Sequence, residues 1–100
     1  MRSVVITAGC RTPIGTINGQ FKALTALDLS IPVMQGLVAR SGVDPKLIED
    51  VIWGCNYQRT YQENNLARVA AIKAPQPHTD PRITVHRNCN SSISSIQLGF

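Results

Sequence analysis

The sequence predicts an α/β fold in which parallel strands alternate with helices. Short apolar runs typical of buried strands alternate with longer stretches in which apolar residues recur every three or four positions. The resulting order is strand, helix, strand, helix, strand, helix. This alternation is typical of a parallel sheet with crossover helices on its faces. A length of 100 residues allows one domain at most.

The first predicted strand covers residues 3–8, which contain a continuous run of β-branched residues. Such a run is typical of a strand buried on both faces of a parallel sheet. Residues 11–19 hold a proline and two glycines, so they predict a long loop after this strand.

The first predicted helix runs from Thr25 to about Arg40. Thr25 and Asp28 are spaced as a capping box, and Gly42 follows as a left-handed C-cap. Pro32 removes a backbone donor inside this helix, so we expect a kink or a loose first turn. One face of the helix is apolar and predicts the contact with the core: Leu27, Ile31, Met34 and Val38.

The second predicted strand covers residues 51–53 and follows a single helical turn at residues 45–49. Residues 56–63 are polar and aromatic without periodicity, which predicts a second loop at a strand end. Tyr57 and Tyr61 in this loop either line a pocket or partner surface or cover the edge of the core.

The second predicted helix covers Leu66 to Lys73, with Asn64 or Asn65 as its N-cap. Three prolines within residues 75–81 predict an extended connector. The third strand is expected to begin at Arg82. Ligands of parallel sheets bind beyond the carboxyl ends of the strands, where the predicted loops lie.

The candidate functional segment is residues 84–92, which contain Cys89. Asn88 is a good N-cap, so the sequence predicts a helix that starts with Cys89 at its first position. There the helix dipole and unpaired N–H groups are expected to lower the thiol pKa and make Cys89 reactive. The alternative is a small buried packing residue. The apolar face of this helix is predicted to be Ile93, Ile96 and Phe100.

The other cysteines do not indicate a metal site or a disulfide framework. Cys10, Cys55 and Cys89 lie far apart with no Cys-x-x-Cys pair, and His78 and His86 lack ligand spacing to them. We therefore interpret Cys10 and Cys55 as packing residues and expect no metal.

Charge and hydropathy exclude further classes. The formal net charge of +4 is scattered along the chain, which argues against a nucleic-acid arm. The apolar runs are too short to span a bilayer, and the N-terminus does not read as a secretory signal. Neither a dinucleotide fingerprint nor a phosphate loop follows any predicted strand. We expect a cytoplasmic protein that binds neither nucleic acid nor membrane.

Taken together, six motifs resemble the N-terminal part of the thiolases, in order and at the spacing of that family. The motifs are Val4-Val5-Ile6 with Arg11-Thr12-Pro13-Ile14-Gly15, Asp28-Leu29, Ser41-Gly42-Val43-Asp44-Pro45, Val51-Ile52-Trp53-Gly54, Asn65-Leu66-Ala67-Arg68, and Thr84-Val85 through Cys89 to Ser91. The resemblance implies a layered α/β/α thiolase fold. It also implies that residues 1–100 are the N-terminal portion of a thiolase N-terminal domain, because the chain stops at Phe100 within the last predicted helix.

The function implied by the resemblance is that of an acetyl-CoA C-acyltransferase in fatty acid metabolism. Cys89 matches the nucleophile that accepts the acyl group, either in condensation of acetyl-CoA to 3-ketoacyl-CoA or in the reverse thiolysis. Coenzyme A would enter only as part of the substrates, with no other cofactor. The family implies a homodimer or homotetramer. A β-ketoacyl synthase and a truncated, non-catalytic interaction module are the alternative functions.

Three residues near Cys89 depart from the common family pattern: His86, Asn90 and Ser92. Asn90 follows the nucleophile directly, so we expect these changes to concern acyl-chain specificity rather than the chemistry. His86 is a less favoured candidate for a base, because a strand residue at this spacing need not face the thiol. The family takes its catalytic histidine, second cysteine and most CoA-binding loops from later sequence. We therefore expect these hundred residues alone to be inactive.

Overall fold

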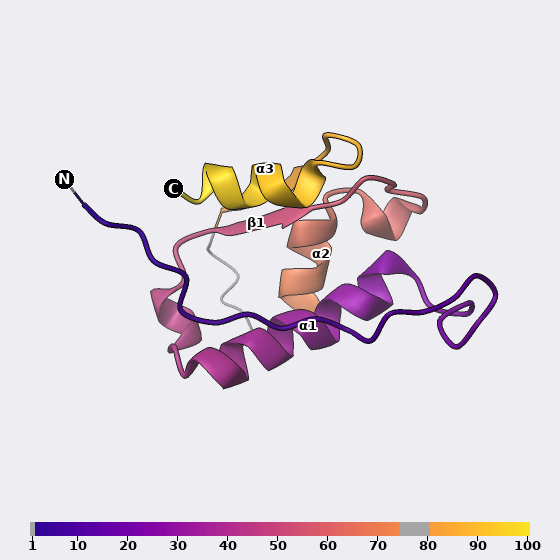
Figure 1. The fold of residues 1–100 in the computed structure, drawn as a ribbon, viewed down its shortest axis with the longest axis horizontal. Helices are drawn as coiled ribbons and strands as arrows, with labels where there is room; N and C mark the ends of the chain where they lie inside the picture. The colour runs from indigo at the N-terminus through magenta and orange to yellow at the C-terminus, as the bar shows by residue number, and fades with distance from the viewer. Residues whose placement is uncertain (1, 75–80) are drawn as a thin grey trace.

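The computed structural model describes residues 2–74 and 81–100, so most of the predicted connector at 75–81 lies outside the described residues. None of the helices in this part of the chain has the length and apolar content that a membrane span requires. Figure 1 shows the elements, which in chain order are α1 (Ala26–Ser41), the 3-10 turn η1 (Pro45–Leu47), β1 (Val51–Gly54), the 3-10 turn η2 (Tyr61–Glu63), α2 (Leu66–Lys73), β2 (Arg82–Val85) and α3 (Ser91–Leu98).

The sheet within the described residues consists of β1 and β2, which pair in parallel. Val51 lies opposite Arg82 at one end of the pair, and Gly54 lies opposite Val85 at the other. In Figure 1, α3 covers one face of β1, whereas α2 and then α1 lie on the other side. The predicted α/β class, with parallel strands between helical layers, is confirmed.

The strand predicted at residues 3–8 is wrong for this structure, because the segment pairs with no other strand among the described residues. Its apolar side chains stay exposed, and Ile6 keeps 76% of its surface in solvent. Two side-chain bonds hold the following residues on α1 instead. Arg40 Nη1 donates to the Gly9 carbonyl at 2.7 Å, and Cys10 Sγ donates to the Val33 carbonyl at 3.3 Å.

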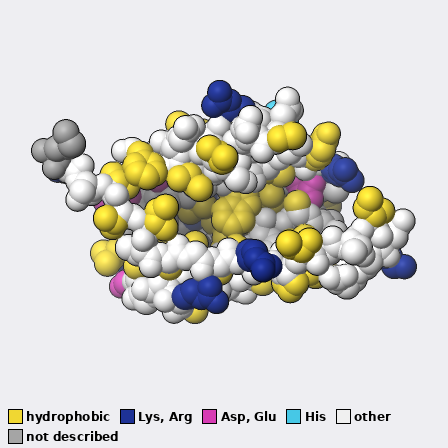
Figure 2. All heavy atoms as spheres, in the orientation of Figure 1, with side chains coloured by type: hydrophobic (Ala, Val, Ile, Leu, Met, Phe, Trp, Pro, Cys, Tyr) yellow, Lys and Arg dark blue, Asp and Glu magenta, His cyan; other side chains and the backbone are white. Residues whose placement is uncertain are grey.

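A groove of about 430 Å³ separates this N-terminal segment from β1. Residues 8–10 line one wall, and residues 52–54 of β1 line the other, together with side chains of α1 and α3. Figure 2 shows the hollow between α3 and the N-terminal segment, with hydrophobic side chains at its floor. A strand needs a partner backbone within hydrogen-bonding distance, and at residues 8–10 the groove lies between the segment and β1.

The predicted capping box of α1 is confirmed. The Asp28 N–H donates to Thr25 Oγ1 at 3.1 Å, and the Thr25 N–H donates to Asp28 Oδ2 at 2.9 Å. This bond from the Thr25 backbone, followed by the bond from its hydroxyl, lowers the pKa of Asp28. The cap therefore stabilises the helix at pH values above the ordinary pKa of an aspartate. This stabilisation is lost as the pH falls through the lowered pKa of Asp28. The helix continues through Pro32 and ends at Gly42, whose φ is +68°.

A side chain of the neighbouring strand β2, and not the side chain of the N-cap residue, caps the start of α2. Asn65 is the N-cap, as one of the two predicted alternatives, but its side chain makes no cap bond and its φ is +51°. The Ala67 N–H instead donates to Thr84 Oγ1 of β2 at 3.0 Å. The same hydroxyl donates to Asn65 Oδ1 at 2.9 Å. These two bonds attach α2 to β2 at Thr84. The turn that carries Cys89 begins three residues later.

The core lies between α1, α2 and β1. The alanines of α2 let its backbone approach α1 and the sheet closely, because a methyl group is their whole side chain. Trp53 packs against this core from β1, and its indole N–H donates to Ser30 Oγ of α1 at 3.1 Å. The buried apolar residues of the core are Leu27, Met34, Cys55, Leu66, Ala70, Ala71 and Ala74.

Candidate active site at the start of α3

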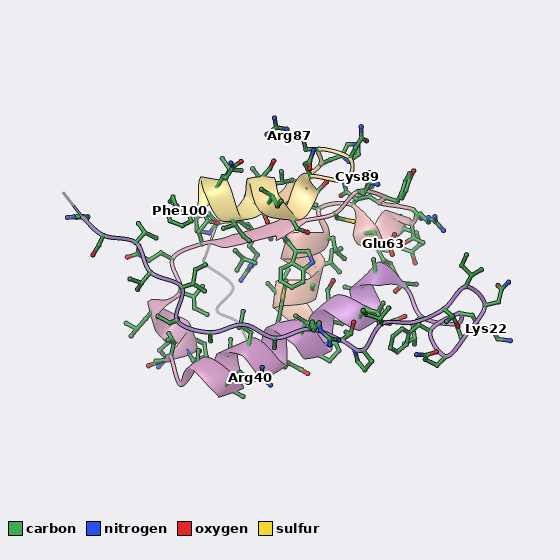
Figure 3. All side chains as sticks on the ribbon, viewed as in Figure 1. Lys22, Arg40, Glu63, Arg87, Cys89 and Phe100 are labelled. Atoms are coloured by element: carbon green, nitrogen blue, oxygen red, sulfur yellow. The ribbon has the colours of Figure 1, made fainter. Side chains whose placement is uncertain are left out.

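Cys89 lies on the loop that leads from β2 into α3. Figure 3 shows Cys89 and Arg87 together on this loop, at the opposite end of α3 from Phe100. Cys89 is exposed, whereas Cys10 is half-buried and Cys55 is buried. A thiol must be accessible to attack a substrate, so Cys89 is the best placed of the three cysteines for chemistry.

The predicted start of the last helix is wrong by two residues. α3 begins at Ser91 with Asn90 as its N-cap, so Cys89 precedes the helix instead of occupying its first position. Asn88, predicted as the N-cap, has a φ of +47° and forms part of a turn. Asparagine is favoured both at N-caps and in left-handed turns, and two asparagines flank Cys89, so local sequence could not decide between them.

We call residues 87–91 the hook, because the backbone reverses there around Cys89. The Asn90 N–H donates to the Arg87 carbonyl at 3.0 Å, and the Ser91 N–H donates to the Asn88 carbonyl at 3.2 Å. The side chain of Ser91 adds two further bonds to the same backbone. None of these bonds uses the Cys89 N–H. The hook therefore leaves Cys89 exposed, with its backbone N–H outside the bonds that close the turn.

The loop after β1 begins beside the hook. The Cys55 N–H donates to the Val85 carbonyl at 3.0 Å, which extends the parallel pairing to the carboxyl ends of both strands. Tyr57 and Tyr61 farther along this loop are 66% and 82% exposed, so neither closes the edge of the core. Residues 11–13 of the predicted loop at 11–19 line a groove with the side chains of α1. The structure therefore brings the start of the predicted loop at 56–63 next to the segment that carries Cys89.

The environment of Cys55 makes it a poor nucleophile. Burial raises the pKa of this thiol, and the negative charge of Glu63 raises it further. Its Sγ also donates to the Tyr57 carbonyl at 3.4 Å. A protonated, buried thiol reacts slowly.

Within the described residues, no three His, Cys, Asp or Glu side chains come together as a metal site.

The apolar residues predicted on one face of α3 are not the side chains that this helix buries. Ile93, Ile96 and Phe100 keep 61%, 54% and 69% of their surfaces exposed. The buried side chains of α3 are Ser91 and Ser94, with 4% and 7% exposed. The helix therefore packs its serine face on β1. The sequence contained a signal for this in its serine cluster, because small side chains allow close packing.

Gly54 at the end of β1 explains why small side chains face the sheet. A Cβ placed on Gly54 would lie 2.6 Å from the Ser92 backbone nitrogen and 2.7 Å from the Ser91 carbonyl carbon. Real Cβ atoms do not approach backbone atoms so closely. The first turn of α3 thus rests directly on the Gly54 backbone. The position of the hook depends on this contact, which no local sequence pattern around Gly54 indicates.

We expect Gly54→Ala to move α3 away from β1 and to destabilise the protein by about 1–3 kcal/mol, the usual effect of overpacking. Thermal denaturation measures the loss, and a crystal structure of the variant measures the movement. The matched control is Gly36→Ala in α1, where an added Cβ meets no atom within 4 Å. That change should not destabilise the helix, because alanine favours helix more than glycine does. Equal stability of the two variants would contradict the prediction.

Comparisons with known proteins assign this chain to a family. The family described as "Thiolase, N-terminal domain" matches residues 4–100. The chain is 45% identical over 97 residues to a 3-ketoacyl-CoA thiolase of Saccharophagus degradans. That match covers 95% of this chain and 25% of the relative. It is 40% identical over 100 residues to a probable acetyl-CoA acyltransferase of Staphylococcus aureus, covering the whole chain and 25% of that relative.

A solved structure agrees with the fold as well as the sequence. The acetyl-CoA acetyltransferase of Bacillus anthracis superposes with a TM-score of 0.87 at 40% identity, covering 95% of this chain and 24% of the other. The chain thus spans about a quarter of the length of the relatives that it matches. The family match covers nearly all of its residues, from the exposed N-terminal segment to α3. On this evidence, the chain belongs to the thiolase family.

Proposed function

We propose that this chain is the N-terminal portion of an enzyme that transfers acyl groups between CoA thioesters through an acyl-Cys89 intermediate. The observation that carries the proposal is the exposed thiol of Cys89 at the tip of the hook, in a chain of the thiolase family. Relatives described as a 3-ketoacyl-CoA thiolase and a probable acetyl-CoA acyltransferase support CoA thioesters as the substrates.

In the first half-reaction, the Cys89 thiolate attacks the carbonyl carbon of an acyl-CoA thioester. The bond from that carbon to the CoA sulfur breaks, CoA leaves as a thiolate that takes up a proton, and the acyl group stays on Cys89. In the second half-reaction, the methyl carbon of acetyl-CoA loses a proton and attacks the acyl-Cys89 carbonyl. The products are 3-ketoacyl-CoA and the regenerated Cys89 thiolate. Thiolysis is the reverse sequence.

This chain contributes the nucleophile and one oxyanion donor. The Cys89 N–H takes no part in the bonds that close the hook, so it can donate to the oxyanion of the tetrahedral intermediate. The proton acceptors, the second cysteine and most CoA contacts would come from later sequence, so these hundred residues alone would be inactive. We further propose that the enzyme uses no cofactor beyond its CoA substrates and works as a cytoplasmic homodimer or homotetramer.

Two other functions fit the hook less well. A β-ketoacyl synthase would use a cysteine in the same way but would take its acyl group from an acyl-carrier protein; the names of the relatives favour CoA instead. A non-catalytic interaction module would need no exposed thiol. The choice of acyl donor distinguishes the synthase, and acylation of Cys89 distinguishes the module.

The direct test is mass spectrometry of the full-length protein mixed with acetyl-CoA and quenched in acid. We expect one acetyl group on the peptide that contains Cys89 and none on the peptides with Cys10 or Cys55. Acetyl-acyl-carrier protein in place of acetyl-CoA should give no adduct. An adduct only with the carrier protein would favour the synthase, and no adduct with either donor would favour the non-catalytic module.

A further inference from the structure

Resting on the proposed function, we infer that Ser91 is a positioning residue for Cys89: its buried hydroxyl, two residues after the nucleophile, bonds the backbone of the two residues before it. Ser91 is the first residue of α3, and only 4% of its surface is exposed. Cys89, two residues earlier, is exposed. A buried polar group therefore supports an exposed reactive one.

The Ser91 hydroxyl uses its donor and an acceptor position within the hook. Its Oγ accepts a hydrogen bond from the Arg87 N–H at 2.9 Å and donates one to the Asn88 carbonyl at 2.7 Å. Arg87 and Asn88 are the two residues that immediately precede Cys89. One side chain therefore closes the turn from which the thiol projects.

The conformation that Ser91 holds is one that needs support. Asn88 has a φ of +47°, a region that residues other than glycine occupy at a cost in free energy. The hydroxyl bonds to the carbonyl of Asn88 itself, so losing it would leave that turn with its backbone bonds alone. We expect the hook then to sample other conformations in which the thiol points elsewhere.

Gly54 fixes the other side of Ser91. The close approach of Gly54 to the Ser91 and Ser92 backbone leaves the first turn of α3 no room to move toward β1. Arg87 adds a second attachment, because its Nη1 donates to Ser94 Oγ one turn farther along the helix at 3.2 Å. The hook is therefore attached to a helix end that is itself fixed on the sheet. Ser91 is the side chain that links the two.

The test compares Ser91→Ala with wild type in the full-length protein, using rapid quenching and mass spectrometry to follow single-turnover acetylation of Cys89 by acetyl-CoA. A misplaced nucleophile reacts more slowly, so we expect a rate about 10- to 100-fold lower at saturating acetyl-CoA. The acetyl-CoA concentration that gives half the maximal rate should change little, because Ser91 is buried under the hook.

A second measurement separates positioning from loss of structure. Iodoacetamide is small and needs no oriented thiol, so Cys89 in Ser91→Ala should react with it at nearly the wild-type rate. Cys55 reports on folding, because it is buried and should stay unreactive as long as the core is intact. Faster alkylation of Cys55, or an equal loss of acetylation and alkylation at Cys89, would overturn the positioning role.

The matched control is Ser95→Ala, which removes a similar bond in the same helix: Ser95 Oγ donates to the Ser92 carbonyl at 2.7 Å. This variant should acetylate at the wild-type rate. If Ser91→Ala also acetylates at that rate, or if Ser95→Ala is slowed equally, the inference about Ser91 fails while the proposed function stands. If wild-type protein itself forms no acetyl-Cys89, both fail.

Discussion

Cys89→Ala in the full-length enzyme is expected to lower kcat for acyl transfer between CoA thioesters by a factor of about 10³ or more, as removal of a covalent nucleophile does. The alanine cannot accept the acyl group, so the reaction loses its two-step route. Because Cys89 is exposed, this change should leave the stability of the protein nearly unchanged. Steady-state assays of thiolysis and condensation measure the loss.

Cys10→Ala is the matched control for this prediction. It removes a thiol that is half-buried and bonded to the Val33 carbonyl, on the segment that lies against α1. Turnover should persist in this variant. If Cys89→Ala kept more than about a tenth of the wild-type kcat, the proposal would be contradicted. A covalent route through Cys89 leaves far less activity than this when the thiol is removed.

Glu63→Gln is expected to destabilise the protein by about 3 kcal/mol, the largest effect that we expect on folding. Glu63 is 3% exposed and joins three backbone N–H groups. Its Oε1 accepts from Ala26 at 3.1 Å, and its Oε2 accepts from Arg59 at 2.7 Å and from Thr60 at 3.2 Å. The carboxylate therefore joins the start of α1 to the loop after β1.

Glutamine keeps the shape of the side chain but replaces one acceptor oxygen with an NH2 group. In either orientation, the amide donors then face at least one backbone N–H, which stays buried without a partner. The variant also loses a negative charge near the N-terminus of α1, where the helix dipole favours it. Urea denaturation of the full-length protein measures the change in unfolding free energy, and hydrogen exchange should quicken at residues 26, 59 and 60.

The control for Glu63→Gln is Glu49→Gln, which makes the same chemical change at an exposed position. Its effect should stay within about 0.5 kcal/mol, as is usual for surface substitutions. Comparable effects of the two variants would show that the bonds of Glu63 add nothing beyond a surface charge. Exchange that stays slow at Ala26 and Thr60 in Glu63→Gln would contradict the structural explanation.

Much of the fold could be predicted from local sequence. The capping box at Thr25 and the left-handed Gly42 set both ends of α1, because their hydrogen bonds lie within a few residues of each other. The bounds of α2 also agree with the prediction, although a hydroxyl of β2 caps its first turn. Of the candidate site, the sequence proposed Cys89 as the reactive cysteine, which is the exposed one of the three, and correctly expected a loop beside it after β1.

The remaining features depend on contacts between distant segments. Glu63 was expected only as the end of a polar loop, yet it accepts bonds from α1, which lies 37 residues away in sequence. Thr84 was expected as a strand residue, yet it caps α2. Neither partner is visible in a local pattern, because the sequence does not state which strand end will lie beside which helix end.

The sequence by itself determined the order of the elements from α1 to α3, the parallel pairing class and the identity of the candidate nucleophile. Only the tertiary structure decided that residues 3–8 lie unpaired, that α3 packs through serines and that Cys89 precedes the helix on a hook. Capping and periodicity act over a few residues and are written in the chain. The place of the hook depends instead on the contact of Gly54 with Ser91, two residues brought together only by folding.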